Sequence, residues 1–126
     1  MIDLIVKESV GRGRGIFSAR AFRVDEIIEV CPVIALSKDD TARLDATYLY
    51  NYYFGWGEHN KGAAIALGFG SLYNHSATPN ARYQKNLADN TISIIATRPI
   101  EAGEEILFTY DMGNAEPSGG LWFVAR

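Results

Sequence analysis

The stretch SLYNHSATPN, residues 71–80, holds the densest group of side chains that could do chemistry. It combines two Asn, one His, two Ser and one Thr directly after an apolar run. A single His is more often a hydrogen-bonded structural residue than a catalyst. No Cys, Asp or Glu lies at ligand spacing from either His75 or His59, so the sequence predicts no metal site.

The stretch GRGRG, residues 11–15, is a second candidate because glycines permit positive φ and close backbone approach to a ligand. A tight turn between two strands would also account for it. A phosphate-binding loop would need Gly-Lys-Ser/Thr and the start of a helix, and neither follows. The interpretations as a turn and as a ligand-binding loop both remain open at this point.

The chain also contains seven tyrosines. A buried phenol has to hydrogen-bond its hydroxyl group, and a tyrosine-rich core would account for Tyr52 and Tyr53. The other tyrosines of interest lie in the same segment, after the polar string, or at the end of the last predicted strand: Tyr48, Tyr50, Tyr83 and Tyr110.

The composition limits what kind of protein these residues belong to. The chain has 126 residues, of which 48% are hydrophobic and 21% charged, which fits a single globular domain. A net charge of −3 argues against broad affinity for nucleic acid, and the lone Cys31 excludes an internal disulfide. No stretch reaches the ~20 apolar residues of a membrane span. The start of the chain shows no signal-peptide pattern, so we expect an intracellular, cytoplasmic protein.

Short β-rich stretches make up most of the elements that must position these residues. We predict a mainly β domain with one short helix in residues 37–57, supported by Ala42, Ala46 and Leu49. A hairpin turn is predicted around residues 88–90. The predicted strands cover residues 2–7, 26–36 with an interruption at Pro32, two parts of 81–99, and 105–111.

Two nine-residue stretches resemble each other within the chain. RAFRVDEII (20–28) and RPIEAGEEI (98–106) share an Arg, an apolar residue two positions later, and Glu and Ile in matching register. Each is typical of a turn that leads into a strand. The match indicates two similar β units.

Three motifs together resemble the SET domain, the catalytic module of protein-lysine methyltransferases. GRGIFS (13–18), YNHSATPN (73–80) and GEEILFTYD (103–111) occur in the order and spacing of that family. The resemblance runs from about residue 3 to residue 111, and the short chain is similar to minimal viral and bacterial members. It implies one SET domain over residues 1–126, a β-clip of small antiparallel sheets with a C-terminal pseudoknot, and a tail at 112–126.

The resemblance also implies S-adenosylmethionine as the methyl donor. Short polar side chains in the Asn-His string would satisfy backbone groups in an irregular buried turn, where each open group costs about 1–3 kcal/mol. Asn80 is expected to hold the pseudoknot together. The residues implied to bind the cofactor are Gly13, Arg14, Gly15, Asn74, His75, Tyr110 and Trp122.

By the same resemblance, a lysine amine attacks the sulfonium methyl group in line, inside a channel lined by tyrosines. Tyr110 matches the tyrosine that orients the amine, while Tyr83 and Tyr48 match further channel tyrosines. Phe108 stands where Phe or Tyr sets the number of methyl groups, and Phe there favours di- or trimethylation. An apolar channel and the adjacent sulfonium charge disfavour the ammonium form, so no dedicated general base is expected.

The chain departs from the family pattern at three points. Ala77 replaces the usual Cys of the string, and Ser71 replaces the Arg that often opens it. No Cys-rich segment is present to close the channel with zinc. Trp122 or Phe123 could close it instead by stacking on adenine, whereas a terminal strand or an interface patch would equally explain LWFVAR.

Two other functions would fit parts of this sequence. A SET-like β-clip could bind a partner without catalysis, but degenerate copies lose the Asn-His pair or the terminal Tyr, both kept here. A small RNA-binding domain using GRGRG has little support at net charge −3. We therefore expect a protein-lysine methyltransferase acting on a histone tail or another protein, with host chromatin as its place of action if viral. The resemblance to viral members, which are dimers, allows a homodimer.

Overall fold

The computed structural model describes residues 3–109 of the chain. In this part the chain forms nine strands, one α-helix and two short 3-10 helices. The elements are β1 (Leu4–Ser9), β2 (Gly13–Ser18), β3 (Ile27–Leu36), α1 (Lys38–Leu44), η1 (Tyr48–Asn51), β4 (Phe54–Trp56), η2 (Glu58–Asn60), β5 (Gly62–Ala66), β6 (Asn74–His75), β7 (Ala81–Asn86), β8 (Thr91–Ala96) and β9 (Leu107–Phe108).

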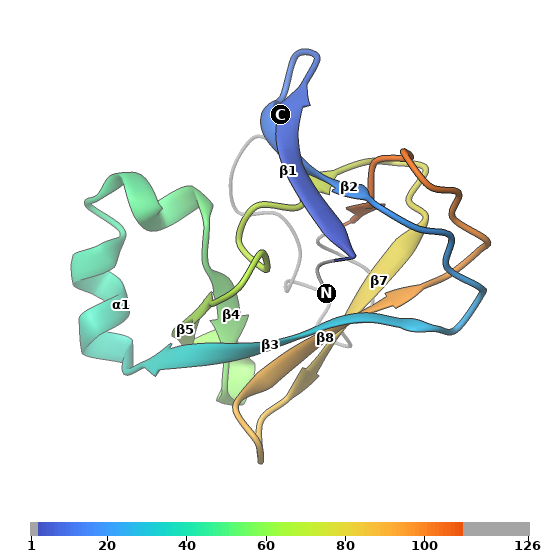
Figure 1. The fold of residues 1–126 in the computed structure, drawn as a ribbon. Helices are drawn as coiled ribbons and strands as arrows, with labels where there is room; N and C mark the ends of the chain where they lie inside the picture. Colours follow the sequence, from blue (N-terminus) through green and yellow to red (C-terminus); the bar gives the residue numbers. More distant parts are fainter. Residues whose placement is uncertain (1–2, 110–126) are drawn as a thin grey trace.

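The strands form three small sheets (Figure 1). The largest has the order β4-β5-β3-β8-β7 and is antiparallel throughout. The hairpin of β1 and β2 stands above it, and α1 lies at the end where β3 meets β5 (Figure 1). The third sheet pairs β6 with β9 in parallel. This confirms the prediction of a mainly β domain with one short helix.

Strand β3 passes through Pro32 without a break, so the predicted interruption is wrong. Residues Ile27 to Pro32 pair with β8, and residues Val33 to Leu36 pair with β5. Proline has no N–H to donate to a ladder. Pro32 stands where the strand changes partners, and its carbonyl oxygen accepts from Leu67 N at 2.8 Å.

Helix α1 begins after Ser37, whose hydroxyl oxygen accepts from Asp40 N at 3.1 Å. This cap satisfies one of the N–H groups that the first turn leaves open. The prediction of one short helix is confirmed, although of its three supporting residues only Ala42 lies in α1. Thr41 is its one buried residue, whereas Ala42 is exposed.

The two similar stretches at 20–28 and 98–106 lie against each other. Phe22 N donates to Ile100 O at 2.8 Å, and Ile100 N donates back to Phe22 O at 2.9 Å. These two residues are the matching apolar positions of the two stretches, and both are buried. The internal similarity therefore reflects two turns that pair with each other.

A single apolar core runs under the sheets. Large side chains from β2, β8 and the segment before β9 fill it, among them Ile16, Ile92 and Ile106, each 0% exposed. Burial of such side chains contributes about 1.5–3 kcal/mol each. Within the polar string, Tyr73, Asn74 and Asn80 are buried at one edge of this core, whereas Ala77 and Thr78 are exposed.

Candidate active site

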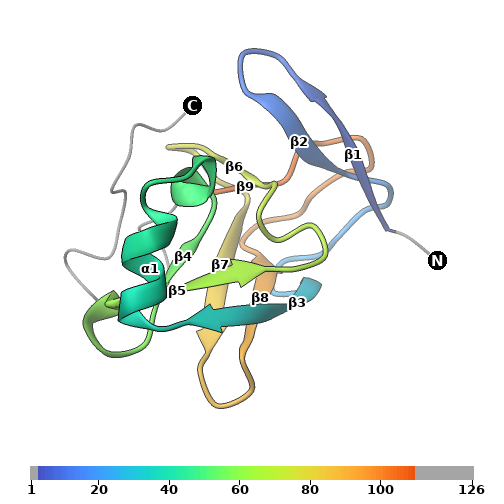
Figure 2. The ribbon, with the colours of Figure 1, turned by 90° about the vertical axis from the view of Figure 1, so that its left-hand side faces the viewer.

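The polar string places Asn74 and His75 in β6, next to Leu107 and Phe108 of β9. Ser76 N extends the pairing by donating to Phe108 O at 3.1 Å. Figure 2 shows β6 and β9 between the α1 side of the molecule and the β1–β2 hairpin. This junction brings together three segments that are far apart in the sequence.

The side chain of Asn74 connects two of these segments. It is 5% exposed, and its Nδ2 donates to Arg14 O at 3.1 Å and to Glu105 Oε2 at 2.9 Å. A Cβ atom at residue 15 would lie 2.8 Å from Asn74 Nδ2, which explains the glycine there. Gly15 therefore gives room to Asn74 and Glu105.

Glu105 is a central residue of the site that the sequence analysis did not single out. Its Oε1 accepts from Ser9 Oγ at 2.8 Å and lies 3.6 Å from Arg12 Nη1. Together with the bond from Asn74, these contacts join the tip of the hairpin to β6. The Glu-Glu pair before β9 was the available signal, but nothing local showed which of the two carboxylates points inward.

Asn80 fixes the segment that leads into β9. It is 1% exposed, its Oδ1 accepts from Leu107 N at 2.8 Å, and its Nδ2 donates to Glu105 O at 2.8 Å. Its backbone N–H donates to Leu107 O at 3.1 Å. The two segments expected to form the pseudoknot are thus bonded together, and the continuation from residue 110 lies outside the described residues.

Within residues 3–109, four aromatic rings form a buried cluster around Phe108 of β9. The ring of Phe108 lies 5.3 Å from that of Tyr83, 5.5 Å from Tyr73 and 6.2 Å from Phe54, measured between centroids. The structure therefore brings together Tyr83 and Phe108, two of the predicted channel residues. Phe54 and Tyr73 also belong to the cluster and were not predicted.

A carboxylate orients Tyr73. The Tyr73 hydroxyl donates to Glu29 Oε1 at 2.7 Å, and Phe69 N donates to Glu29 Oε2 at 3.0 Å. Burial raises the pKa of Tyr73 well above its ordinary value, and the negative charge of Glu29 raises it further. The phenol therefore stays protonated, and Glu29 holds the loop before β6 through both bonds.

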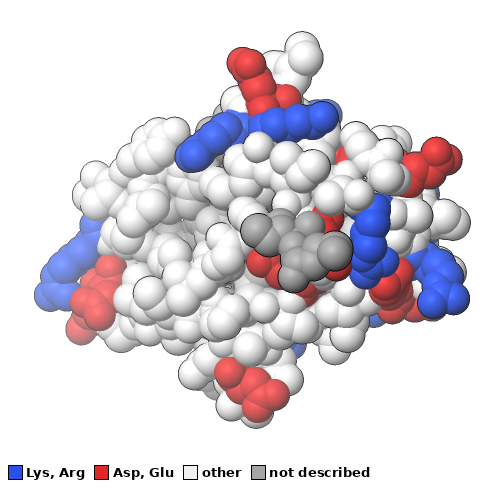
Figure 3. Space-filling view, viewed as in Figure 1, with Lys and Arg blue, Asp and Glu red and all other residues white. Residues whose placement is uncertain are grey.

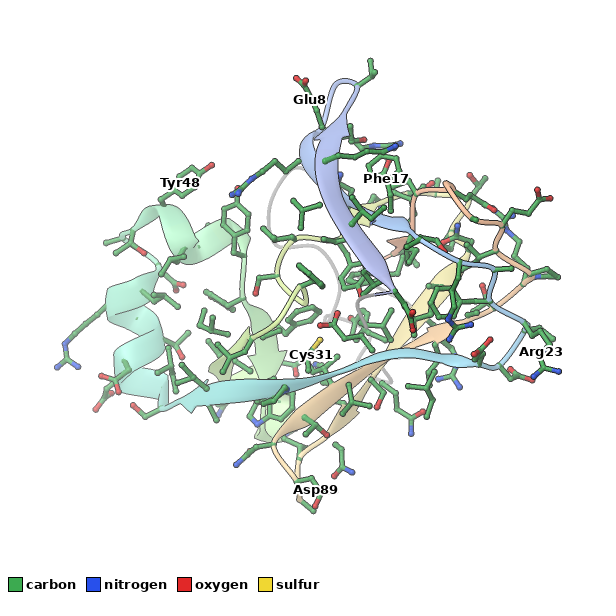
Figure 4. All side chains as sticks on the ribbon, viewed as in Figure 1. Glu8, Phe17, Arg23, Cys31, Tyr48 and Asp89 are labelled. Atoms are coloured by element: carbon green, nitrogen blue, oxygen red, sulfur yellow. The ribbon has the colours of Figure 1, made fainter. Side chains whose placement is uncertain are left out.

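The same carboxylate acts on the lone cysteine, which Figure 4 shows in the interior of the molecule. Burial, followed by the charge of Glu29, raises the pKa of Cys31. A thiol of this kind is not a nucleophile at neutral pH. Cys31 is a core residue, with no contribution to the chemistry of the site.

A cavity of about 280 Å³ opens beside the junction. A second cavity of about 250 Å³ shares most of its lining and adds the apolar side chains of Leu49 and Ile65. The residues that line the first cavity are Arg12, Gly13, Arg14, Tyr48, Tyr52, Ser71, Leu72 and Tyr73.

Tyr48 lies at this cavity and not in the aromatic cluster. It is 74% exposed, its hydroxyl lies 3.0 Å from that of Tyr52, and Figure 4 shows it at the surface. Two of the expected cofactor residues, Gly13 and Arg14, line the same cavity. Gly13 adopts a φ of +74°, a conformation that favours glycine.

Of the remaining expected site residues, only some lie in the described part of the chain. His75 is half-buried within β6. Tyr110, Trp122 and Phe123 lie outside the described residues. Among residues 3–109, no group of three or more His, Cys, Asp or Glu side chains could hold a metal ion.

Charge is distributed unevenly around the site. Figure 3 shows basic side chains beside acidic ones over the β1–β2 hairpin, above a face with few charged residues. The hairpin carries Lys7, Arg12 and Arg14, of which two line the cavity. In the part of the chain that the structure describes, no helix is long and apolar enough to span a membrane.

Comparison with known proteins gives a consistent result. A family model described as SET domain matches residues 13–111. A Schizosaccharomyces pombe protein named histone-lysine N-methyltransferase, H3 lysine-37 specific, is 32% identical over 121 residues, covering 95% of this chain and 76% of that protein. The N-lysine methyltransferase KMT5A of Xenopus tropicalis is 30% identical over 114 residues, covering 79% of this chain and 33% of that protein.

Solved structures share the fold. A Plasmodium falciparum structure, reported as a proposed histone methyltransferase, has a TM-score of 0.70 and 28% identity, covering 89% of this chain and 96% of that chain. The CpSET8 protein from Cryptosporidium has a TM-score of 0.71 and 22% identity, covering 88% of this chain and 58% of that chain.

Proposed function

The chain belongs to the SET-domain family of methyltransferase domains, and we propose that it transfers methyl groups from S-adenosylmethionine to a lysine side chain of a protein substrate. The observation that carries the proposal is the junction of β6 and β9. There Asn74 joins the glycine stretch to Glu105 beside a cavity of about 280 Å³. The named activities of the relatives support the same reaction.

The residues around the cavity fit the proposed cofactor. S-adenosylmethionine carries a carboxylate, an adenine ring and a sulfonium that supplies the methyl group. The cavity offers guanidinium groups for the carboxylate and tyrosine rings that can stack on a base or face a cation. Its volume of about 280 Å³ and the 250 Å³ of its neighbour each lie just below the roughly 300–1,000 Å³ usual for small-molecule sites, and the two cavities share most of their lining.

In this proposal the glycine stretch and β6 have different tasks. Gly13 lines the cavity, and Gly15 lets Asn74 approach the Arg14 carbonyl group. Asn74 and Glu105 hold that backbone in place, so that the wall of the cavity is formed before any ligand binds. Such preorganisation lowers the entropic cost of binding.

The aromatic cluster is proposed to border the lysine channel. Tyr83 is 2% exposed, Phe108 is 1% exposed and Phe54 is 4% exposed, so this region excludes water. An apolar surrounding disfavours the ammonium form of a lysine, whose ordinary pKa is about 10.4. The cluster would thereby favour the neutral amine that the transfer needs.

We propose a protein substrate and favour a histone, because the relatives above include enzymes named for histone lysines. The experiment is incubation of the purified chain with histones, a non-histone lysate and isotope-labelled cofactor. Mass spectrometry then locates the modified residue and counts its methyl groups. Label on a non-histone protein alone would contradict the histone preference and leave the lysine reaction standing.

Tyr110→Phe tests the expected role of that tyrosine. If its hydroxyl orients the amine, loss of the hydroxyl lowers kcat by about 100-fold or more, because misplacement of a reactant has costs of this order. Circular dichroism should show an unchanged fold, and calorimetry should show that the cofactor still binds. Full activity in this variant would remove Tyr110 from the mechanism. Absence of cofactor binding by the unmodified chain would favour a partner-binding protein instead.

A further inference from the structure

The β1–β2 hairpin has one covered edge and one open edge. The outward carbonyl groups of β2 accept hydrogen bonds from other segments of the chain. These bonds run from Asn74 to Arg14, from Ile106 to Ile16 and from Gly103 to Ser18. Strand β1 pairs only with β2 in the described residues, and Figure 2 shows it on the outer side of the hairpin. The hairpin therefore ends in an exposed strand edge.

The open backbone groups on this edge belong to alternate residues of β1. At the two ends of the strand, Asp3 O accepts at 2.8 Å and Ser9 O accepts at 3.0 Å from N–H groups on the β2 side. Backbone groups alternate in direction along an antiparallel strand, so the even-numbered residues turn theirs outward. These residues are Leu4, Val6 and Glu8, and no backbone group of residues 3–109 bonds to them on that side. A second extended chain can satisfy such groups by adding a strand.

A third cavity, of about 390 Å³, lies beside this edge. It is bordered by residues 7–10, by Phe17 of β2, and by Arg12 and Glu105. Side chains alternate between the two faces of a strand, so Lys7 and Phe17 lie on one face of the hairpin and Arg14 lies on the other. Arg14 lines the proposed cofactor cavity, and the third cavity shares only Arg12 with that lining. The third cavity therefore belongs to a different face of the hairpin.

Lys7 supplies the charge that this cavity can offer to a ligand. Its Nζ lies 4.5 Å from the centroid of the Phe17 ring, and within residues 3–109 it makes no ion pair. The guanidinium of Arg12 already lies 3.6 Å from the Glu105 carboxylate. Figure 4 shows Glu8 pointing away from the body of the molecule at the hairpin tip. A carboxylate that enters the cavity therefore has Lys7 as its partner.

The position of Lys7 also decides which strands can pair with β1. A lysine on an exposed edge disfavours pairing with an apolar strand. On an added antiparallel strand, the residue directly opposite Lys7 lies on the same face, with its Cβ about 4.5–5.5 Å away. At this distance an acidic side chain is favourable and a basic side chain is unfavourable.

We propose that the open edge of β1 binds an extended segment of a partner protein as an added antiparallel strand, with an acidic side chain opposite Lys7. Main-chain hydrogen bonds to Val6 and Glu8 supply affinity, and the contact with Lys7 supplies specificity. The segment binds on the hairpin and not at the proposed lysine channel. The inference concerns the recruitment of a partner and does not depend on methyl transfer.

The test is an NMR titration of the isotope-labelled chain with synthetic peptides. The first probe is acetyl-TVTETVT-amide, and the second has Gln in place of the central Glu. Two further probes carry N-methyl groups, one on both residues that flank the Glu and one on the Glu itself. In the proposed pairing only the flanking N–H groups face β1, because the residue opposite Lys7 turns its backbone groups away. The proteins are the unmodified chain, Lys7→Gln and a control, Lys38→Gln, whose exposed lysine begins α1.

We expect the first peptide to slow solvent exchange of the Val6 and Glu8 amide hydrogens and to leave that of Lys7 unchanged. Its Kd should be about two- to fivefold lower than that of the Gln peptide. Lys7→Gln should remove this difference, and Lys38→Gln should retain it. Methylation of the flanking residues should abolish binding, whereas methylation of the Glu should not.

Four results would overturn the proposal: no binding of the first peptide at millimolar concentration, equal binding of the Glu and Gln peptides, equal binding of the two methylated peptides, or unchanged exchange at Val6 and Glu8 in the bound state. Protection of these amides in the free chain would also overturn it. Protection that grows with protein concentration would assign the edge to a second copy, and constant protection would assign it to the chain itself. Binding of S-adenosylmethionine is measured separately, so failure here leaves the proposed function standing.

Discussion

Two regions of this molecule have the same order of hairpin and turn, but only one of them contributes a carboxylate to the site. Residues 4–28 contain the β1–β2 hairpin and the first turn, and residues 82–106 contain most of the β7–β8 hairpin and the second turn. The hairpin loops cover residues 10–12 and 87–90. Within each turn an Arg pairs with a Glu six residues later: Arg20 with Glu26 at 2.8 Å, and Arg98 with Glu104 at 3.4 Å.

Each region completes the turn of the other. Asp25 N donates to Ala96 O at 2.8 Å, and Gly103 N donates to Ser18 O at 2.7 Å. Asp25 and Gly103 occupy the same position of the two turns, and both have positive φ values, 68° and 90°. The similarity seen in nine letters of sequence therefore extends to the backbone geometry.

The difference begins at the residue after the shared Glu. In the first region this residue is Ile27, which is 55% exposed at the start of β3. In the second it is Glu105, which joins Ser9 and Asn74 at the site. The two regions therefore share one backbone arrangement. The site depends on Glu105, for which the first region has no equivalent.

The largest effect on stability should come from removing the Glu105 carboxylate. Glu105→Ala removes the acceptor of Ser9 Oγ and one of the two acceptors of Asn74 Nδ2, whose bond to Arg14 O remains. Each buried donor group left open costs about 1–3 kcal/mol. We expect a loss of at least ~2 kcal/mol in the free energy of unfolding, together with weaker cofactor binding. The matched change Ile27→Ala, at an exposed position, should cost less than ~1 kcal/mol. Urea unfolding of both variants measures the difference, and equal losses would contradict it.

A smaller effect should separate the two positive-φ residues. Gly103→Ala puts a side chain at φ 90°, where no atom lies within 4 Å, so its cost is backbone strain of about 1–2 kcal/mol. Asp25→Gly should change stability by less than that, because Asp already tolerates this conformation and the added chain entropy opposes the relief of strain. Thermal or urea unfolding would show the asymmetry. A neutral Gly103→Ala would mean that the second turn relaxes without cost.

The smallest effect should be on how the free energy of unfolding depends on pH. The hydrogen bond from Arg20 lowers the pKa of Glu26, and the N–H of Glu101, with help from Asn80 and Arg98, lowers the pKa of Glu104. A lowered pKa in the folded state contributes stability above the unfolded value of about 4.3, and this contribution is lost as pH falls through the folded value.

We therefore expect the free energy of unfolding to decline below about pH 5. The decline should be shallower in Glu104→Gln than in Glu26→Gln, because more groups donate to the Glu104 carboxylate. It accepts from Glu101 N, Asn80 Nδ2 and Arg98 Nη1, whereas the Glu26 carboxylate accepts from Arg23 N and Arg20 Nη2. Urea midpoints measured across this pH range give the slopes. The same slope in both variants would show that the two turns respond to protons alike.

Features that depend on short stretches could be predicted from sequence, and features that depend on distant partners could not. The repeated pattern predicted two similar β units, and residue types predicted the short helix that follows Ser37. The pairing of Phe22 with Ile100, 78 positions apart, was found only in the structure. Glu29 and Glu105 were missed because each acts on a residue far along the chain. The partner of Glu29 is Tyr73, 44 positions away, and Ser9 lies 96 positions from Glu105.

Only two of the four rings in the aromatic cluster were predicted, again because the others depend on distant partners. Tyr83 and Phe108 belong to recognisable motifs, whereas Phe54 and Tyr73 join them only through the folding of β4 and the loop before β6. Tyr48 illustrates the converse. From its residue type alone, a tyrosine in a crowded aromatic segment fits either the channel or the cavity wall. The 3-10 helix η1 carries Tyr48 and places it at the cavity wall.

The mutual closure of the two turns also has a consequence for synthesis on the ribosome. The first turn receives its backbone partners from residues 96 and 100, and the second receives them from residues 18 and 22. At about 5–20 residues per second, the N-terminal hairpin waits several seconds for its counterpart to emerge. During that interval its apolar surface has no native cover, which makes the nascent chain a natural client for chaperones that bind exposed apolar segments.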